Sequence, residues 1–179
     1  GHYVAEYSVL SVENAPSLEV LGIGPNAFKN ADALRLNGLS KLKKVEISAD
    51  SFTNKEGVFE LKNCASVSEL VVGNRSLSSF SSFKITTTPS LKTITIGDGC
   101  LKTVGAFALS GLSGLESVVV GSSSFSNKNG AFSVVNCTSL ESVEIGASSM
   151  GAYSVLSVEN TPSLEVLAIG SNTFKNVAA

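Results

Sequence analysis

The sequence repeats itself every 24 or 25 residues, and this period constrains what the chain can fold into. A segment of the form LxxVxIG, or a close variant of it, begins at residues 18, 42, 67, 91, 115, 140 and 164. A second apolar alternation starts eight residues before each segment, at Leu10, Leu34, Phe59, Phe83, Phe107, Phe132 and Leu156. A fixed period of this length is typical of solenoids, in which each repeat forms one turn. The pattern therefore predicts a mainly β solenoid of seven turns, with two short strands in each turn.

Longer periods lie on top of this one. Pro16, Pro89 and Pro162 are 73 residues apart, as are Cys64 and Cys137, so three turns form a larger unit. Two such units make a 146-residue module, because residues 7–30 and 153–176 agree at 20 of 24 positions. We expect a single solenoid domain that is a segment of a longer array, with residues 1–9 as the end of a preceding turn. The predicted turns are 10–33, 34–58, 59–82, 83–106, 107–131, 132–155 and 156–179.

The apolar positions of successive repeats predict stacked columns in one core. One inward column is Ile23, Ile47, Val72, Ile96, Val120, Ile145 and Ile169, and another is Phe28, Phe52, Leu77, Leu101, Phe125, Met150 and Phe174. A single turn buries too little to offset its own chain entropy, so stability must come from stacking against neighbours. With strands ~4.8 Å apart, six turns should advance about 29 Å.

Glycine and asparagine recur where each strand should end. Six turns have glycine after the main strand, at Gly24, Gly73, Gly97, Gly121, Gly146 and Gly170. We expect a glycine conformation or a close backbone approach there. Asparagines that can form side-chain ladders recur at Asn14, Asn63, Asn136 and Asn160, and at Asn30, Asn54, Asn127 and Asn176. The links show no sustained 3.6-residue period, so we expect short turns or 3₁₀ pieces and little or no helix.

Composition and charge exclude several classes of function. Thirteen basic and fifteen acidic residues leave a net charge of −2, which is too small and mixed to predict a nucleic-acid partner. The sequence has no apolar run long enough for membrane insertion and no recognisable targeting signal. The only histidine is His2, so no internal histidine can act as a catalytic base or metal ligand. We therefore expect no enzyme activity and no cofactor.

The cysteines and the one aspartate-glycine turn are interpreted as structural. Cys64 and Cys137 occupy equivalent places three turns apart, ~14 Å at the strand spacing, which is too far for a disulfide. Cys100 stands where other turns have a small residue, so all three are expected to be buried fillers. Asp98 in the segment IGDGC occurs in only one turn, whereas calcium-binding repeats need such a motif in consecutive turns. The sequence therefore predicts no metal site.

The first turn resembles the leucine-rich-repeat family. In LEVLGIGPNAF, residues Leu18, Leu21, Ile23, Asn26 and Phe28 match the motif LxxLxLxx(N/C)xL. The segment IGPNAFKN looks more specifically like the BspA-like subgroup, known for surface and adhesion proteins of bacteria and protists. The resemblance implies a right-handed coil and an extracellular or cell-surface location. The middle turns depart at the asparagine place of the motif, where they have Asp50, Arg75, Gly99, Ser123 and Ser148.

Outward columns of the main strands are the best candidate for a binding face. The candidate residues are Lys43, Lys44, Glu46, Glu69, Lys92, Thr93, Thr95, Glu116, Glu141 and Glu144. The alternative interpretation is a solvated sheet face with cross-strand charge pairs, such as Lys43 with Glu19. Two N-glycosylation sequons occur, at Asn74 in NRS and Asn136 in NCT. Asn74 is the better acceptor candidate, because Asn136 lies at a predicted ladder position.

Two functions follow from these features. The first is a non-enzymatic repeat scaffold of an extracellular or cell-surface protein that binds or adheres to a protein partner. The second is a structural fibre in which the 146-residue module repeats or stacks end to end, so that the partner is a neighbouring copy. An enzyme is disfavoured, because the sequence shows no recognisable pair of acid and base residues.

Overall fold

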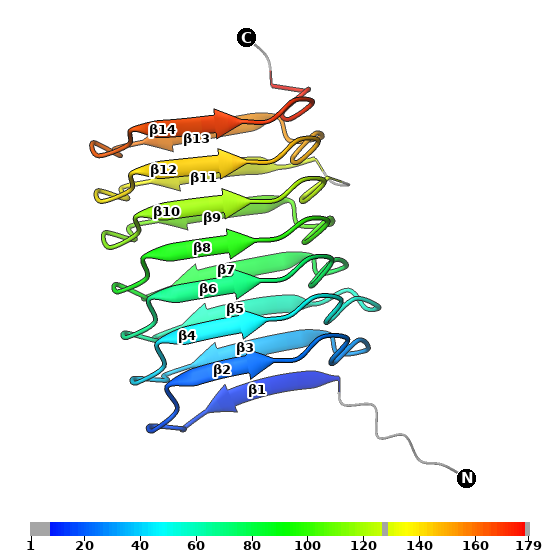
Figure 1. The fold of residues 1–179 in the computed structure, drawn as a ribbon, viewed down its shortest axis with the longest axis vertical. Helices are drawn as coiled ribbons and strands as arrows, with labels where there is room; N and C mark the ends of the chain where they lie inside the picture. Colours follow the sequence, from blue (N-terminus) through cyan, green and yellow to red (C-terminus); the bar gives the residue numbers. More distant parts are fainter. Residues whose placement is uncertain (1–7, 127–128, 178–179) are drawn as a thin grey trace.

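The computed structural model describes residues 8–126 and 129–177, which form a β-solenoid of seven turns (Figure 1). Each turn contributes two strands. The odd-numbered strands are β1 (Val9–Glu13), β3 (Ala33–Asn37), β5 (Val58–Lys62), β7 (Ser82–Thr86), β9 (Ala106–Ser110), β11 (Ala131–Val135) and β13 (Val155–Glu159). The even-numbered strands are β2 (Val20–Ile23), β4 (Lys44–Ile47), β6 (Glu69–Val72), β8 (Thr93–Ile96), β10 (Ser117–Val120), β12 (Ser142–Ile145) and β14 (Val166–Ile169). Turns connect these strands, and the described residues contain neither α-helix nor 3₁₀-helix.

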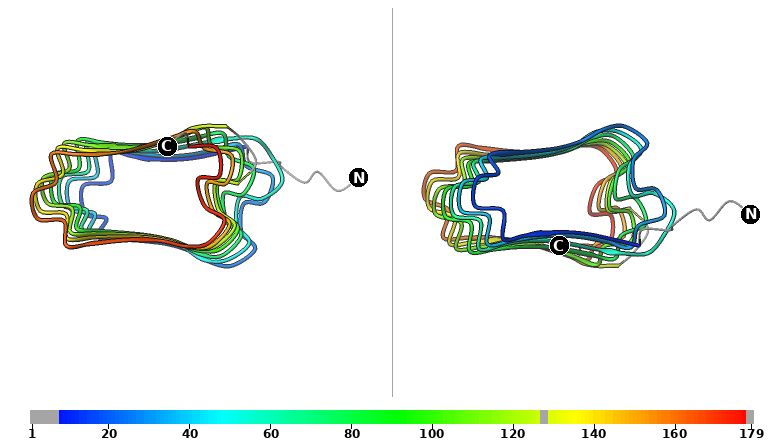
Figure 2. Two further views of the ribbon diagram at one scale, coloured as in Figure 1. Left: turned by 90° about the horizontal axis from the view of Figure 1, so that it is seen from above. Right: turned by 90° about the horizontal axis from the view of Figure 1, so that it is seen from below.

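All strand pairs are parallel, and their register reproduces the sequence period. Ile23 pairs with Ile47, and Leu10 pairs with Leu34, each one repeat apart. The even strands form one seven-stranded sheet, which we call the front sheet, while the odd strands form a four-stranded and a three-stranded sheet behind it. Seen along the long axis, the turns superpose as a flattened ring (Figure 2). Front strands run left to right and back strands right to left as the chain climbs, so the coil is right-handed (Figure 1).

The core lies between the front and back sheets and follows the predicted columns. Side chains of both columns are buried in the middle turns, and Phe52, Leu77, Leu101 and Phe125 are fully covered. At the outermost turns the prediction holds for Ile23 and Phe174, which are buried, and is wrong for Phe28 and Ile169, which are 40% and 42% exposed. These two side chains belong to the first and last described turns, which have a neighbour on one side only. Burial of each layer therefore depends on the layer next to it.

Aromatic side chains from the back strands continue the core along the axis. Phe59 and Phe83 stack with ring centroids 4.7 Å apart, and Phe107 contacts Phe83, Phe125 and Phe132 at 5.7, 4.9 and 5.6 Å. These distances are in the range of favourable aromatic pairs. Four of the seven turns thus share one aromatic column.

Left-handed backbone conformations form the corners of the turns. Positive φ occurs at three positions in each turn, so the residues concerned form three columns along the stack. They are Asn14, Gly38, Asn63, Thr87, Gly111, Asn136 and Asn160; then Asn26, Asp50, Arg75, Gly99, Ser123, Ser148 and Asn172; then Phe28, Phe52, Leu77, Leu101, Phe125, Met150 and Phe174. Asparagine and glycine tolerate this conformation best, which accounts for their frequency in the first column.

Each of the two predicted asparagine columns contains one hydrogen-bonded pair of asparagines from neighbouring turns. The Nδ2 of Asn160 donates to the Oδ1 of Asn136 at 2.9 Å, and Asn54 donates in the same way to Asn30 at 2.9 Å. Asn127 lies outside the described residues. The ladders connect side chains one turn apart and so reinforce the register that the strands set.

Five of the six glycines after the front strands are required by close approach and not by positive φ, whereas a Cβ on Gly24, in the first described turn, would meet nothing within 4 Å. A Cβ placed on Gly146 would lie 2.6 Å from the backbone nitrogen of Ser122, and one on Gly170 would lie 2.5 Å from that of Ala147. Both atoms belong to the turn below. Ser48 takes this place in the second turn, directly over the first described turn. The predicted close backbone approach is therefore confirmed at five of these glycines and is wrong at Gly24.

A buried column of hydroxyl groups lies inside the same corner. Ser51, Ser76, Ser124 and Ser149 are fully buried. The Oγ of Ser76 accepts a hydrogen bond from the backbone N–H of Ser51 at 3.1 Å and donates to the carbonyl of Ser48 at 2.7 Å. Small hydroxyl side chains thus satisfy backbone groups of the turn below, which burial would otherwise leave without a partner.

The back face is interrupted between β7 and β9, which are not hydrogen-bonded to each other. Thr87 follows β7 with a φ of 55°, in the column where the other turns have asparagine or glycine. The next residue, Thr88, is buried, and its Oγ1 has no hydrogen-bond partner. A cavity of about 270 Å³ opens here against Lys84 and Ala106. A β-branched residue in the left-handed region is strained, so this turn carries two unfavourable threonines.

Replacing Thr87 with asparagine should raise the free energy of unfolding by about 1 kcal/mol, because asparagine adopts positive φ at lower cost. The denaturant midpoint measures this change. Thr95→Asn on the front sheet is the matched control. Asparagine is disfavoured within a strand, so the control should leave the midpoint unchanged or lower it. A lower midpoint for Thr87→Asn would contradict the strain assigned to this corner.

Candidate binding surface

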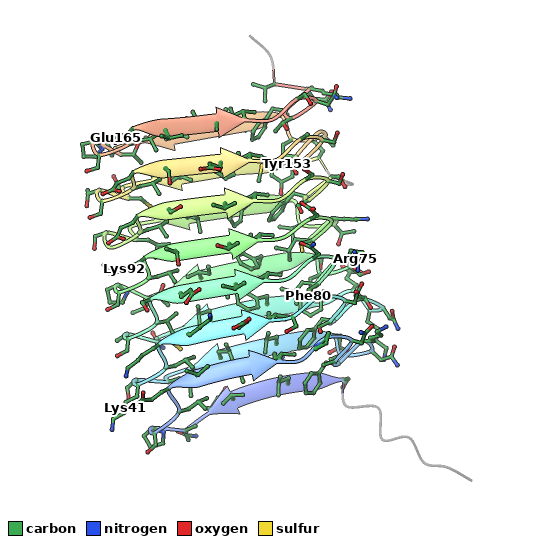
Figure 3. The ribbon with its side chains drawn as sticks, viewed as in Figure 1. Lys41, Arg75, Phe80, Lys92, Tyr153 and Glu165 are labelled. Carbon is green, nitrogen blue, oxygen red and sulfur yellow. The ribbon has the colours of Figure 1, made fainter. Side chains whose placement is uncertain are left out.

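All ten residues of the predicted binding face lie along the front sheet, either in its strands or next to them. The columns that begin at Lys43, Lys44 and Glu46 lie on or immediately before the even strands, and their side chains are exposed or half-buried. Figure 3 labels Lys92 and Glu165 beside the ends where the front strands begin. The strands thus place side chains from five turns on one continuous surface.

The lysines of this surface are neutralised by neighbouring glutamates. Lys43 Nζ lies 2.8 Å from a carboxylate oxygen of Glu19, so the predicted pair between them is confirmed. Lys92 lies 2.7 Å from Glu116. The hydrogen bond to Glu116 raises the pKa of Lys92 above its ordinary value. Exposed pairs of this kind stabilise the fold only weakly, but they determine which charges remain free for a partner.

The third lysine of the surface is shared between two carboxylates. Lys44 lies 3.2 Å from Glu46 and 3.5 Å from Glu69. The hydrogen bond to Glu46 is the main cause that raises the pKa of Lys44. Glu141 and Glu144, by contrast, make no ion pair with any residue in the described ranges. The two carboxylates of the predicted face that have no ion-pair partner within the described residues therefore lie in its C-terminal half.

A shallow groove of about 410 Å³ adjoins Glu144. Its polar lining includes Asp98 and Glu144, and its apolar lining includes Val119, Ala168 and Ile169. Its floor is the glycine column at Gly121, Gly146 and Gly170. Because these residues have no side chain, the surface is hollowed between the outward strand positions and the adjoining turns. The glycine column was predicted to form a corner, but the groove was not predicted.

Asp98 takes part in a side-chain-to-backbone ladder along the groove. Its Oδ1 accepts a hydrogen bond from the backbone N–H of Ser122 at 2.7 Å, and its own N–H donates to Asn74 Oδ1 at 2.9 Å. The prediction of a turn residue at Asp98 is confirmed. Within residues 8–126 and 129–177, no group of three or more His, Cys, Asp or Glu side chains is placed to hold a metal ion.

An exposed ion pair lies at the adjacent corner. The Nε and Nη2 of Arg75 each donate to one carboxylate oxygen of Asp50, both at 2.7 Å. This bidentate hydrogen bond holds the pKa of Asp50 below its ordinary value of 3.8. The lowered pKa means that the pair contributes stability above pH 3.8. That contribution is lost as the pH falls through the pKa of the folded state.

The substitution Arg75→Gln should therefore move the pKa of Asp50 up toward 3.8, because the charged donor is lost. Carboxyl-carbon NMR across an acid titration measures this shift. Lys92→Gln is the control, because Lys92 lies at the opposite end of the front strands, just before β8. This variant should leave the pKa of Asp50 unchanged. An unchanged value in the Arg75 variant would show that the pair does not form in solution.

The three cysteines are buried and free, as predicted. Cys100 occupies the hydroxyl column, where its Sγ lies 3.2 Å from the carbonyl oxygen of Gly73. Burial raises its pKa to about 11 and also raises the pKa of Cys64 and Cys137. Thiolates are the reactive form, so these side chains are poorly suited to nucleophilic or ligand roles at neutral pH.

Both sequon asparagines are exposed, and both act as hydrogen-bond acceptors. Asn136 Oδ1 accepts from Asn160, and Asn74 Oδ1 accepts from the backbone of Asp98. The structural role expected for Asn136 is thus shared by Asn74. His2, the only histidine, lies outside the described residues.

None of the described residues forms a helix long and apolar enough to cross a membrane. No protein-family model matches the chain, and no curated protein or solved structure matches it either.

Proposed function

We propose that this chain is a non-enzymatic repeat scaffold that binds a protein partner through the front sheet. The observation that carries the proposal is the unbroken register of seven parallel strands on this face, in contrast to the interrupted back face. A rigid face of this kind presents side chains from every turn at fixed spacing. No cofactor or catalytic group takes part in this proposal.

The charges of the surface indicate the chemistry of the partner. Every lysine in the predicted binding face is paired, whereas Glu141 and Glu144 form no ion pair within the described residues, and Glu144 lines the groove. Val119 and Ala168 supply apolar surface beside them. These features favour an extended segment that carries Lys or Arg side chains between apolar ones.

The test is binding of an alternating Val-Lys peptide, with an alternating Val-Glu peptide of equal length as the negative probe. The double variant Glu141→Gln and Glu144→Gln should weaken binding of the Val-Lys peptide at least threefold. The double variant Glu60→Gln and Glu159→Gln, on the back strands β5 and β13, removes the same two charges from the other face and should leave binding unchanged. Equal losses in both variants would mean attraction to net charge alone and would refute the front-sheet site.

A second pair of variants tests the groove sterically. Ala168 lines the groove and Ala108 lies on the back strand β9, and both residues are exposed. Ala168→Phe should fill the groove and weaken binding of the peptide, whereas Ala108→Phe should not. Equal binding by both variants would remove the groove from the proposal.

The location and family belong to the same proposal. The motif matches at Leu18, Leu21, Ile23, Asn26 and Phe28 support a leucine-rich-repeat assignment, and the segment IGPNAFKN supports the BspA-like subgroup. An extracellular or cell-surface adhesion role rests on that resemblance. Glycosidase treatment of protein secreted from a eukaryotic host would show whether Asn74 or Asn136 is modified.

A second candidate function is a structural array built from the 146-residue module. The observation that favours it is the internal repeat, in which residues 7–30 and 153–176 agree at 20 of 24 positions. Inserting a further copy of residues 8–153 after Tyr153 should lengthen the rods seen by electron microscopy by about 29 Å. Rods of unchanged length would exclude an array of this module.

A further inference from the structure

The fourth and fifth turns are joined by hydrogen-bonded strands on one side of the solenoid only. On the front, β8 pairs with β10 along its whole length, and Lys92 forms an ion pair with Glu116 of the next turn at 2.7 Å. On the back, β7 and β9 lie at consecutive levels but are not hydrogen-bonded to each other (Figure 1). The front sheet is therefore the main hydrogen-bonded connection between turns one to four and turns five to seven.

Main-chain hydrogen bonds that close the ends of the back strands elsewhere are missing at this level. At four other levels, the N–H that follows a back strand donates to a carbonyl of the next turn, at 3.0 to 3.2 Å: Gly38 to Lys62, Asn63 to Thr86, Gly111 to Val135 and Asn136 to Glu159. Thr87 is the equivalent residue of the fourth turn. At the other end of the strands, Val58 and Ala131 donate to the turn below at 3.0 and 3.1 Å, and Ala106 is equivalent to them. Neither Thr87 nor Ala106 donates its N–H to any atom in the part of the chain that the structure describes.

The gap between β7 and β9 reaches the core. The cavity of about 270 Å³ is lined by residues 81–86 of one turn and by Ala106 of the next. Ile85 packs against the core but is only partly buried, whereas its counterparts Leu61 and Leu109 are 0% and 2% exposed. Solvent therefore approaches the core through the opening between these two strands.

A buried hydroxyl without a partner follows β7 at the same level. Thr88 is 1% exposed, and its Oγ1 has no hydrogen-bond partner. The equivalent residues of the neighbouring turns, Cys64 and Leu112, are buried as well but carry no hydroxyl. Burial of a hydroxyl without a hydrogen bond costs free energy, which contact with water recovers. The fourth turn therefore has a local cause for opening that the turns on either side lack.

We propose that the solenoid has a hinge at this level. Turns one to four and turns five to seven form two rigid blocks, the front sheet between β8 and β10 is the hinge, and the back face opens between β7 and β9. Opening lengthens the back of the solenoid relative to the front, so it makes the front sheet concave. It separates Phe83 from Phe107, whose rings lie 5.7 Å apart, and the hydration of Thr88 offsets part of that loss. The inference goes beyond the proposed function, since it holds whatever the front sheet binds.

Spin-label distances across the gap test the hinge. With the three native cysteines replaced by serine, one pair of labels is placed at Arg35 and Ala108 on the back, and a second pair at Glu46 and Val119 on the front. Both pairs join turns two and five, so both span three layers, or ~14 Å at the strand spacing. Pulsed electron paramagnetic resonance should give a distance distribution for the back pair that is at least twice as wide as that of the front pair and extends to longer distances, because only the back face opens.

A third pair of labels, at Ser11 and Lys84, is the control for labels on back strands. It also spans three layers, but it stays within turns one to four and does not cross the gap. Its distance distribution should therefore be as narrow as that of the front pair.

Removal of the buried hydroxyl should close the hinge. Thr88→Val keeps the shape of the side chain but leaves no hydroxyl to hydrate, so it should narrow the distribution of the back pair and raise the denaturant midpoint. Thr103→Val is the matched control, because the Oγ1 of Thr103 donates to the carbonyl of Phe80 at 2.8 Å. The control should lower the denaturant midpoint and leave the distribution of the back pair unchanged.

Three results would overturn the proposal. The first is a back pair whose distribution is no wider than that of the front pair, since the seven turns would then stack as one rigid body. The second is an equally wide distribution for the control pair at Ser11 and Lys84, since the width would then come from the back strands in general. The third is a back pair that stays as wide in Thr88→Val, since opening would then not depend on the buried hydroxyl.

Discussion

Replacing Gly146 with alanine should lower the free energy of unfolding by about 2–3 kcal/mol, as overpacking of a tightly packed interior does. The added Cβ would lie 2.6 Å from the backbone nitrogen of Ser122 and 2.7 Å from the carbonyl carbon of Gly121. Both atoms are main-chain atoms of the turn below, so relief requires the two layers to separate. Urea denaturation followed by circular dichroism measures the loss.

The matched control is Gly24→Ala, the same substitution in the same column. A Cβ on Gly24 would meet nothing within 4 Å. Alanine also restricts the unfolded chain, so this variant should keep its stability or gain up to about 1 kcal/mol. Similar losses in the two variants would show that the close layer contact at Gly146 does not limit the fold.

Replacing Phe107 with alanine should cost about 3–5 kcal/mol, the usual range for deleting a fully buried phenylalanine. Phe107 is completely buried and contacts the rings of Phe83, Phe125 and Phe132. It lies on β9, beside the interruption of the back face. No hydrogen bonds between β7 and β9 stabilise the stack at this level. The loss is a large part of the 5–15 kcal/mol that stabilises a typical domain.

Phe28→Ala is the matched control for this substitution. Phe28 is 40% exposed and stacks on Phe52 alone, with its other face open. Its removal should cost no more than about half as much as removal of Phe107, because less surface is buried there. Comparable losses would mean that the aromatic column does not concentrate stability in the middle turns.

The repeat itself made most of the fold predictable. Identical spacing of apolar residues gives the register directly, so the pairing of Ile23 with Ile47 and the Lys43–Glu19 contact followed from the sequence period. Glycine at the end of the front strands predicted close approach, since no other residue type recurs there so strictly. These features depend on local patterns that every turn repeats.

Other features depend on differences between turns, and the repeat concealed them. Thr86 and Thr87 are compatible with strand structure, so nothing at that point indicated an interruption between β7 and β9. The strain becomes evident only when Thr87 is compared with Asn63 and Gly111 in a column whose φ is positive. The positive φ of Phe52 was also unpredictable, because bulky residues rarely adopt this conformation.

The candidate surface was predicted as a set of residues but not as an arrangement of charge. The sequence placed Lys44 and Glu144 on one face, yet the pairing of Lys44 with Glu46 and Glu69 depends on side-chain geometry. The groove over Gly146 likewise arises because glycine has no side chain, which leaves a depression between the outward strand residues and the adjoining turns. Such features follow from three-dimensional packing and not from spacing alone.

The most direct test of the stacked-layer account is a set of spin-label distances along one outward column. With Cys64, Cys100 and Cys137 replaced by serine, one label is placed at Glu46 and the second at Glu144 or at Ala168. These positions are four and five turns away, so backbone separations of about 19 and 24 Å are expected at ~4.8 Å per turn. Pulsed electron paramagnetic resonance should show the second distance longer than the first by about one layer. Equal distances, or a shorter distance to Ala168, would contradict a continuous stack.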